Sequence, residues 1–359
     1  MRAGTQLYVR DLSLSLRALG HEPIVYAPIL GTVATELEDA GVRVVDDLDK
    51  LDAPPDIIHG NQAIETIVAL LFFPQTPGVY FCHSWVARLE VPPLFPRIQR
   101  YVAVDEPCYE YLLASGVTKE NTRVILNFVD LARFKQRCPL PERPRRALVF
   151  SNYANAQSNL KTIREACSRN AIDVDAFGEG VGYVEKKPEM KLGEYDVVFA
   201  KGRAALEAMA VGAAVILCDV WGVGPMVSVG EFDHLRRLNF GRRTLQDEVT
   251  VEAIQKQMDR YDSRDAAEVS RRIRANAGID AATALVLDVY EEAIADYKRH
   301  KPMLDEEGRA AARFILSRDA HHASHIALTL RLRNRLLRIP IIGPGVVWLR
   351  EWQRASRVL

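Results

Sequence analysis

The chain has 359 residues, 48% of them hydrophobic, and its 47 Lys and Arg residues balance 47 Asp and Glu residues. A chain of this length fits two domains, each able to bury a sizeable core. The zero net charge excludes a generic nucleic-acid binder, which needs a net basic surface, but it allows a small anionic ligand held by a few cations. The five cysteines are scattered without a CxxC spacing, which indicates reduced thiols.

No secretory signal opens the chain. The longest apolar run near its start, residues 67–73, is far shorter than the roughly 20 residues that span a bilayer. We therefore expect a cytoplasmic protein.

Helices and strands alternate along the first half. The apolar residues of 6–19 lie largely on one helical stripe, and Gly20 ends that helix. A buried strand is predicted at residues 23–27. Further strands are predicted at 42–45, 56–59, 79–82, 101–104 and 123–126, with helices at 63–71 and 107–115. The alternation predicts parallel βαβ units in an open, doubly wound sheet.

A linker, residues 138–146 with the sequence CPLPERPRR, separates this pattern from a second one. The second domain is predicted to hold strands at 147–150, 174–177, 196–200 and 214–218, with helices at 159–167, 203–211, 250–260, 263–276 and 282–299. The predicted organisation is an N-terminal domain over 1–137, the linker as a hinge, a C-terminal domain over 147–302 and a helical tail over 303–359. Two α/β domains in tandem predict a ligand cleft at the carboxyl ends of their strands.

The tail is basic and apolar. From residue 326 onward it carries seven arginines against one acid, together with two tryptophans. One interpretation is an anchor that lies on a membrane surface. The other is a tail that packs on the body of the protein or on a second copy, since Pro340 and Pro344 prevent a continuous helix.

Four segments of the chain resemble the retaining glycosyltransferases numbered family 4, over residues 1 to about 300. They are a glycine loop and first helix, a strand that ends in a histidine, the segment that closes the first domain, and a donor-binding helix with the strand after it. In this sequence they are residues 3–22, 79–83, 101–134 and 206–216. The resemblance implies a GT-B fold, two Rossmann-like domains that face a cleft.

The resemblance also implies an activity. A sugar would move from a nucleoside diphosphate sugar to a hydroxyl acceptor, with retained anomeric configuration, no metal and no further cofactor. The acceptor would be a glycan or lipid-linked glycan in surface polysaccharide or glycolipid synthesis, at the inner face of a membrane. Two alternatives stay open: a non-catalytic binding or scaffold protein of this fold, and a sugar-nucleotide epimerase.

The motif from Lys201 through Gly202 and Arg203 to Glu207 is the main candidate site. It follows a predicted strand and opens a helix, where backbone amides and cations can hold the charge of a leaving diphosphate. We expect Lys201 and Arg203 to serve as these cations. By resemblance, Glu207 would accept hydrogen bonds from ribose hydroxyls.

Other candidate residues lie in the first half. Gly4, with Thr5 beside it, opens the first helix. By resemblance, this loop would closely approach the donor phosphate and the acceptor, which requires a residue without Cβ. By resemblance, His83 would contact the transferred sugar or the reacting centre, through its ring or its backbone carbonyl. His59, at the end of another strand, would line the acceptor side, and Asn127 is a further candidate.

The sequence departs from the family pattern at three positions. Tyr153 and Ser158 stand where the family has an arginine and a lysine for the diphosphate, and Phe199 stands where it usually has a glutamate. Lys161 is a candidate substitute for a missing cation, a few residues late. The histidines at 321, 322 and 325 have a helical spacing without nearby acids, so we predict no metal site there.

The chain also starts at its glycine loop, without the central strand that the family has before it. Either the true start lies upstream, or the sheet is built without its middle strand.

Overall fold

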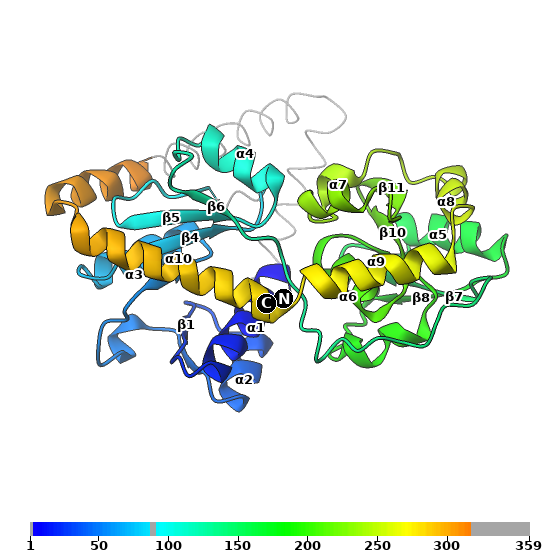
Figure 1. The fold of residues 1–359 in the computed structure, drawn as a ribbon, viewed down its shortest axis with the longest axis horizontal. Coiled ribbons are helices and arrows are strands. Elements are labelled where there is room, and N and C mark those ends of the chain that lie inside the picture. Colours follow the sequence, from blue (N-terminus) through cyan, green and yellow to red (C-terminus); the bar gives the residue numbers. More distant parts are fainter. Residues whose placement is uncertain (1–2, 87–90, 317–359) are drawn as a thin grey trace, which may run out of the picture. The chain divides into compact units, whose positions relative to one another are not determined.

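The computed structural model describes residues 3–86 and 91–316, which form two compact units (Figure 1). The larger unit runs to Pro92 and from Arg97 to Lys301, and the smaller holds Pro93–Pro96 and the chain from Pro302 onward. In the smaller unit, residues 304–316 are helical. The predicted anchor at 326–359 and the histidines at 321, 322 and 325 lie outside the described residues.

The first half alternates helices and strands as the sequence predicts. Its elements are α1 (Gly4–Ala18), β1 (Ile24–Tyr26), α2 (Thr32–Asp39), β2 (Arg43–Val45), β3 (Ile58–Gly60), α3 (Ala63–Phe72), β4 (Gly78–Cys82), β5 (Ile98–Ala103), α4 (Glu106–Ala114) and β6 (Thr122–Val124). Gly20 and Gly116 follow α1 and α4 with φ of +90° and +96°, a backbone conformation that ends a helix and favours glycine. The sequence does not predict α2, because its two buried residues, Val33 and Leu37, are too few for a periodic signal.

The strands of this half form two separate parallel sheets, β1-β2 and β3-β4-β5-β6. Among residues 3–86 and 91–316, no strand joins β1 to the larger sheet. The strand predicted at 23–27 is present as β1, but the prediction that it is buried is wrong, because Ile24 is 40% exposed. Of the β1 residues, Val25 packs against α2, on a small hydrophobic cluster that includes Val33 and Leu37.

The long helix α10 (Ile279–Arg299) packs on the first half of the chain, against α1, β4 and β5 (Figure 1). Ala282, Val286 and Val289 share one hydrophobic cluster with residues of α1, β4 and β5. The Thr283 hydroxyl lies 2.9 Å from that of Ser15, and Arg100 of β5 donates to Glu292 at 3.0 Å. The last helix of the second half thus completes the core of the first.

The second half forms one five-stranded sheet in the order β11-β10-β9-β7-β8. Its elements are β7 (Arg146–Phe150), α5 (Asn159–Ser168), β8 (Asp173–Phe177), β9 (Val197–Ala200), α6 (Gly202–Val211), β10 (Ala214–Asp219), β11 (Gly222–Met226), α7 (Phe232–Arg237), α8 (Val251–Met258) and α9 (Ser263–Asn276). Four strands are parallel, and β11 returns antiparallel to β10. The sequence misses β11, because two glycines and a proline within five residues are typical of a turn.

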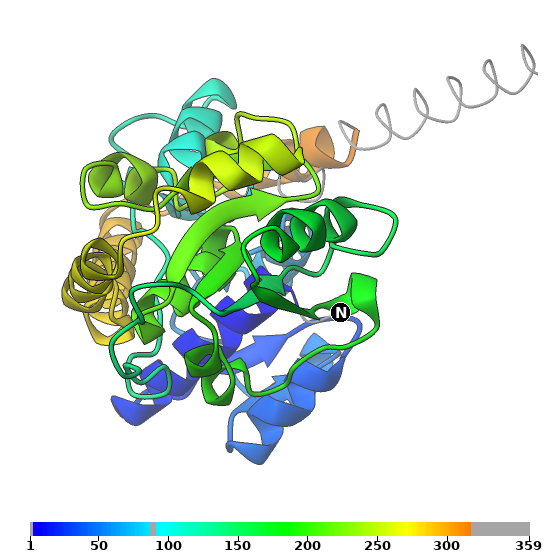
Figure 2. The ribbon, with the colours of Figure 1, turned by 90° about the vertical axis from the view of Figure 1, so that its right-hand side faces the viewer.

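Helices cover both faces of this sheet (Figures 1 and 2). Alternate strand residues enter different hydrophobic clusters, as the two-residue period of a strand requires. Val198 and Val215 pack on the side of α6 and α9, whereas Val197 and Ile216 pack on the side of α5 and α8. The sheet is therefore doubly wound, as predicted.

The five cysteines are free thiols. Within the part of the chain that the structure describes, no helix is long and apolar enough to cross a bilayer.

Candidate functional site

The predicted motif lies where parallel strands end. β9 ends at Ala200, between β7 and β10, and α6 begins at Gly202. Gly202 has a φ of +57°, which L side chains rarely adopt, so this turn favours glycine. Lys201 is the residue before the helix, and no side chain caps the α6 amino terminus. The structure thus places the motif at the sheet edge where open α/β folds bind ligands.

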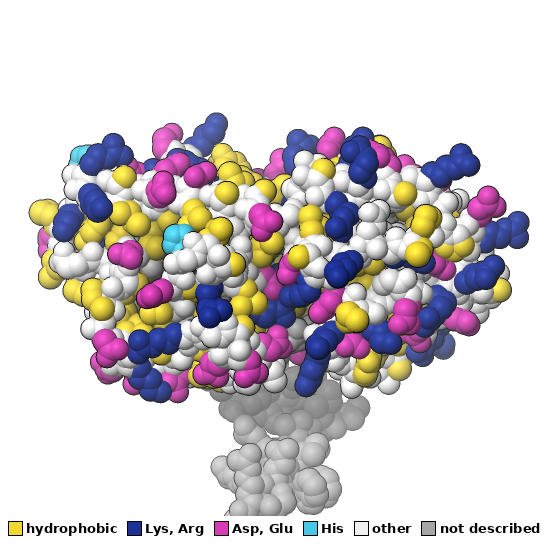
Figure 3. All heavy atoms as spheres, turned by 60° about the horizontal axis from the view of Figure 1, so that its bottom comes forward, with side chains coloured by type: hydrophobic (Ala, Val, Ile, Leu, Met, Phe, Trp, Pro, Cys, Tyr) yellow, Lys and Arg dark blue, Asp and Glu magenta, His cyan; other side chains and the backbone are white. Residues whose placement is uncertain are grey.

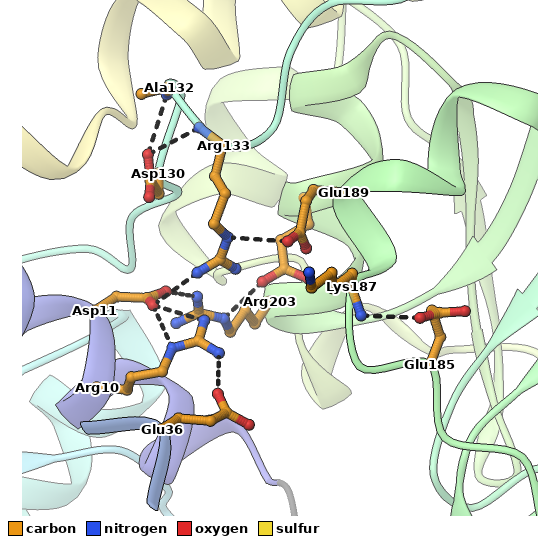
Figure 4. A network of polar contacts seen from close by, with 11 residues as sticks. Arg10, Asp11, Glu36, Asp130, Ala132, Arg133, Glu185, Lys187, Glu189 and Arg203 are labelled. Atoms are coloured by element: carbon orange, nitrogen blue, oxygen red, sulfur yellow. Dashed lines mark hydrogen bonds and ion pairs between the residues drawn. The ribbon is translucent and has the colours of Figure 1, made fainter. Parts of the chain in front are cut away.

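Arg203 is not the free cation that the sequence predicts. Its Nε donates to Glu207 Oε1 at 2.7 Å, and its Nη2 donates to Asp11 Oδ2 of α1 (Figure 4). The side chain is only 12% exposed. Two carboxylates therefore compensate Arg203, and a phosphate would have to displace one of them to bind it.

Asp11 is the centre of this network (Figure 4). It is almost fully buried and is contacted by Arg10 at 2.6 Å, Arg133 at 3.1 Å and Arg203. Burial alone would raise the pKa of Asp11, but the three guanidinium groups outweigh burial and hold this pKa below its usual value. Asp11 is therefore a charged residue of the core, and Arg10 in turn pairs with Glu36 at 3.0 Å.

Glu207 is buried at 4% exposure, within the second turn of α6. Burial raises its pKa above the usual value, and the neighbouring Arg203 opposes that shift only in part. By resemblance, Glu207 would accept hydrogen bonds from a ribose. In this structure its Oε1 accepts a hydrogen bond from Arg203 Nε.

Lys201 is the more accessible cation of the motif, at 26% side-chain exposure. Its Nζ lies 3.2 Å from Oδ2 of Asp219, the last residue of β10. The same Nζ lies 5.4 Å from the ring centroid of Tyr153 and 5.2 Å from that of Trp221. The position where the family has an arginine thus holds an aromatic ring that contacts a lysine from the neighbouring strand.

The two candidate histidines belong to one aromatic cluster with Tyr8. His83 follows β4 directly, and its Nε2 lies 2.7 Å from Asn61 Oδ1. His59 stacks on Phe81, and its Nδ1 lies 2.6 Å from the Tyr290 hydroxyl of α10. Burial lowers the pKa of His83 to about 4 and that of His59 to about 3. Both rings are therefore neutral at neutral pH.

The remaining candidates are more loosely placed. Gly4 and Thr5 open α1, and a Cβ on Gly4 would meet no atom within 4 Å, so packing in the described residues does not require glycine there. Lys161 is exposed on α5. Asn127 contributes its backbone carbonyl, which accepts from Arg236 Nη2 at 2.7 Å.

Two departures from the family pattern have structural roles. Ser158 precedes α5, and its Oγ accepts from the Asn155 amide at 2.9 Å. Phe199 is buried in β9. Neither residue supplies the positive charge that the family pattern would place near the diphosphate.

The sequence alone does not identify four residues that lie at or near the site. Contacts between residues distant in the chain bring them there: Asp11, Asp219, Trp221 and Arg236. Arg236 is 7% exposed, its Nη1 has no hydrogen-bond partner among the described residues, and burial lowers its pKa to about 10. Arg236 stands beside Arg237 in a segment of mixed polar and apolar residues, 231–240, so the sequence carries no signal that Arg236 is buried.

The comparisons with known proteins agree with this architecture. Residues 40–133 match the family model of glycosyltransferase family 4. No curated protein matches the chain. Among solved structures, the chain is similar to a glycosyltransferase from Rickettsia africae ESF-5 at 14% identity and a TM-score of 0.58, over 82% of this chain and 96% of that one.

Two further structures share the fold. HepE of Anabaena, crystallised with UDP and glucose, has 14% identity and a TM-score of 0.59, over 81% of this chain and 96% of its own. Sucrose-phosphate synthase from Thermosynechococcus elongatus has 15% identity and a TM-score of 0.58, over 82% and 94%. The chain has the GT-B fold. The match of residues 40–133 to the family 4 model and the shared fold agree with the resemblance that the sequence indicates.

Proposed function

We propose that the protein is a glycosyltransferase that uses a nucleoside diphosphate sugar as donor and a hydroxyl group as acceptor. The observation that carries the proposal is the α6 amino terminus at the carboxyl edge of the second sheet, with Lys201 before it and Glu207 within it. No side chain caps this terminus, although the Gly202 amide donates to the Phe240 carbonyl at 2.7 Å. Structures of HepE with UDP and with UDP-glucose support a donor of this class. Retention of configuration and independence of metal rest on the family resemblance.

The chemistry requires cations for the departing diphosphate. Lys201 is more exposed than Arg203 and Arg236, and it can exchange Asp219 for a phosphate without unfolding any element. Arg203 becomes available only when Asp11 releases it. Arg236 forms no ion pair among the described residues, so a nearby anion would offset the cost of burying its charge.

A nucleoside diphosphate release assay with a panel of donors tests this function. We expect donor-dependent release that falls about a hundredfold in Glu207→Ala, because the substitution removes the partner that orients Arg203. Glu194→Ala, at an exposed glutamate of the same half, is the matched control and should keep wild-type rates.

The same assay separates the alternatives. A scaffold protein would release nothing with any donor, which would refute the proposal. An epimerase would convert the donor sugar without releasing the diphosphate and without an acceptor. A transferase needs the acceptor for rapid release.

We also propose that the acceptor is a glycan or lipid-linked glycan and that the protein works at the surface of an anionic membrane. The exposed positions of α3, which are Ile64, Val68, Leu71 and Phe72, are all large and apolar, at 40–47% exposure. They recur every three or four residues and so form one stripe. Hydrophobic side chains also gather on the left of Figure 3, the side of the first half.

Basic residues adjoin this stripe. α10 ends in the exposed run Lys298-Arg299-His300-Lys301. Lys301 Nζ reaches Gln75 Oε1, in the turn after α3, at 3.5 Å. An apolar stripe beside a basic cluster is the combination that binds an anionic membrane surface.

Vesicle sedimentation checks the membrane proposal. The full chain should sediment with phosphatidylglycerol vesicles and less with phosphatidylcholine vesicles. The double substitution Val68→Glu with Leu71→Glu should lower the bound fraction about tenfold. Met190→Glu, at an exposed methionine of the second half, is the control. Equal binding of the double variant and the wild type would contradict this role for α3.

A further inference from the structure

Two exposed aromatic side chains stand at the carboxyl edge of the second sheet. Tyr153 lies in the loop after β7 and is 52% exposed, and Trp221 lies in the turn between β10 and β11 and is 45% exposed. Their rings meet edge to face, with centroids 4.8 Å apart. Large aromatic residues tend to be buried, and an exposed pair at a ligand-binding edge is typical of a binding site.

A buried carboxylate holds the two loops together. Asp219 is 1% exposed, and its Oδ1 accepts from the Ser151 hydroxyl at 2.9 Å and from the Val220 amide at 2.8 Å. The Ser151 Oγ in turn accepts from the Tyr153 amide at 3.2 Å. The Tyr153 loop and the Trp221 turn are therefore linked through one residue, and the ring pair is held in place before any ligand arrives.

The turn that carries Trp221 is further fixed by the residue after it. Gly222 has a φ of +157°, and a Cβ there would lie 2.8 Å from the Asp247 carbonyl oxygen. The ring pair thus has a rigid support on the side of β11.

Cations surround the rings. Lys201 Nζ lies over both, and Arg242 Cζ lies 4.8 Å from the Trp221 ring centroid. Asp219 compensates Lys201, and the exposed Arg242 adds a second positive charge beside the Trp221 ring. An uncharged ring can stack on such a surface, and a phosphate attached to that ring can reach Lys201.

We infer that Tyr153 and Trp221 form a stacking platform for a ring of the donor, with the attached phosphate directed at Lys201. This inference rests on the proposed donor class. It gives a binding role to Trp221 and to Tyr153, which stands where the family pattern has a cation. Stacking needs only a ring face, so the ring is either the nucleobase or the sugar. Free nucleosides and free hexoses distinguish these two sources.

Tryptophan fluorescence of the full chain tests the platform. Titration with a nucleoside diphosphate sugar should quench the wild type and Trp85→Phe, which changes an exposed tryptophan of the first half. Trp221→Phe should lose the quenching and keep most of the affinity, because phenylalanine retains a ring. Tyr153→Ala should weaken binding about tenfold, and Tyr153→Phe should restore it.

The outcomes separate the two proposals. If the wild type binds no nucleotide, nucleotide sugar or sugar phosphate by calorimetry, both the donor class and the platform fail. If it binds a donor and Tyr153→Ala binds equally well, the platform alone is overturned. Competition by the free nucleoside identifies the base as the stacked ring, and competition by the free hexose identifies the sugar.

Discussion

The substitution Asp11→Asn is expected to lower the free energy of unfolding by about 3–5 kcal/mol. It removes the carboxylate that Arg10, Arg133 and Arg203 share, and each guanidinium group then faces a neutral amide in the core and keeps only its second partner, which is Glu36, Glu189 or Glu207 among the described residues. Removing one partner of a buried ion pair costs more than the pair contributes, since the remaining charge stays desolvated. Chemical denaturation at neutral pH measures the change.

The pH dependence of stability gives an independent check. The pKa of Asp11 is lower in the folded chain than in the unfolded one, so the folded state binds fewer protons there. Its stabilising contribution is present above the unfolded pKa, about 3.9, and is lost as the pH falls through the folded pKa. Asp11→Asn should therefore show a smaller loss of stability between pH 5 and pH 3 than the wild type.

Glu36→Gln is the matched control, because Glu36 contacts the same network through Arg10 but is 35% exposed. Its effect should stay below about 1 kcal/mol. If Glu36→Gln lost as much stability as Asp11→Asn, the half-exposed Glu36 would matter as much as the buried Asp11. That result would contradict the central role given to Asp11.

Most of the fold can be predicted from the sequence, because helices and strands here carry strong local signals. Gly20, Gly116 and Gly212 end helices where the apolar periodicity stops, and Val197–Ala200 is apolar throughout. The strand β11 is missed because its pairing with β10 overrides its turn-like composition. Burial of β1 is wrongly predicted because burial depends on a neighbouring strand, which the local sequence of β1 does not contain.

The site is predicted only in its position. The order of strand and helix in the sequence predicts that Lys201 and Gly202 lie at the end of β9. It does not predict which residues these two contact. Asp11 lies far from Arg203 in the chain, and a lone aspartate in an amphipathic helix reads as a surface residue. Three-dimensional contacts decide which cations are compensated, and these contacts leave Lys201 as the most accessible one.

Lys201→Met is expected to lower kcat/KM for the donor by about a hundredfold, because Arg203, the other cation of the motif, is held by two carboxylates. Methionine keeps the length and apolar stem of lysine, so the Tyr153 and Trp221 rings remain covered. The buried Asp219 carboxylate loses its ammonium partner, so stability should also fall, and the kinetics are measured at a temperature where the variant is folded. Lys191→Met, at a lysine that is 48% exposed, is the control. A Lys201→Met enzyme with wild-type kcat/KM would refute this role.

Asp219→Asn completes a double-mutant cycle with Lys201→Met. In the wild type, Asp219 and a donor phosphate compete for the same ammonium group, which lies 3.2 Å from the carboxylate. Neutralising Asp219 should therefore tighten binding of the nucleoside diphosphate in the wild-type background and have no such effect in the Lys201→Met background. Calorimetry of the four proteins measures the coupling. Equal effects of Asp219→Asn in both backgrounds would mean that Asp219 acts by holding the Tyr153 and Trp221 loops together and not through the charge of Lys201.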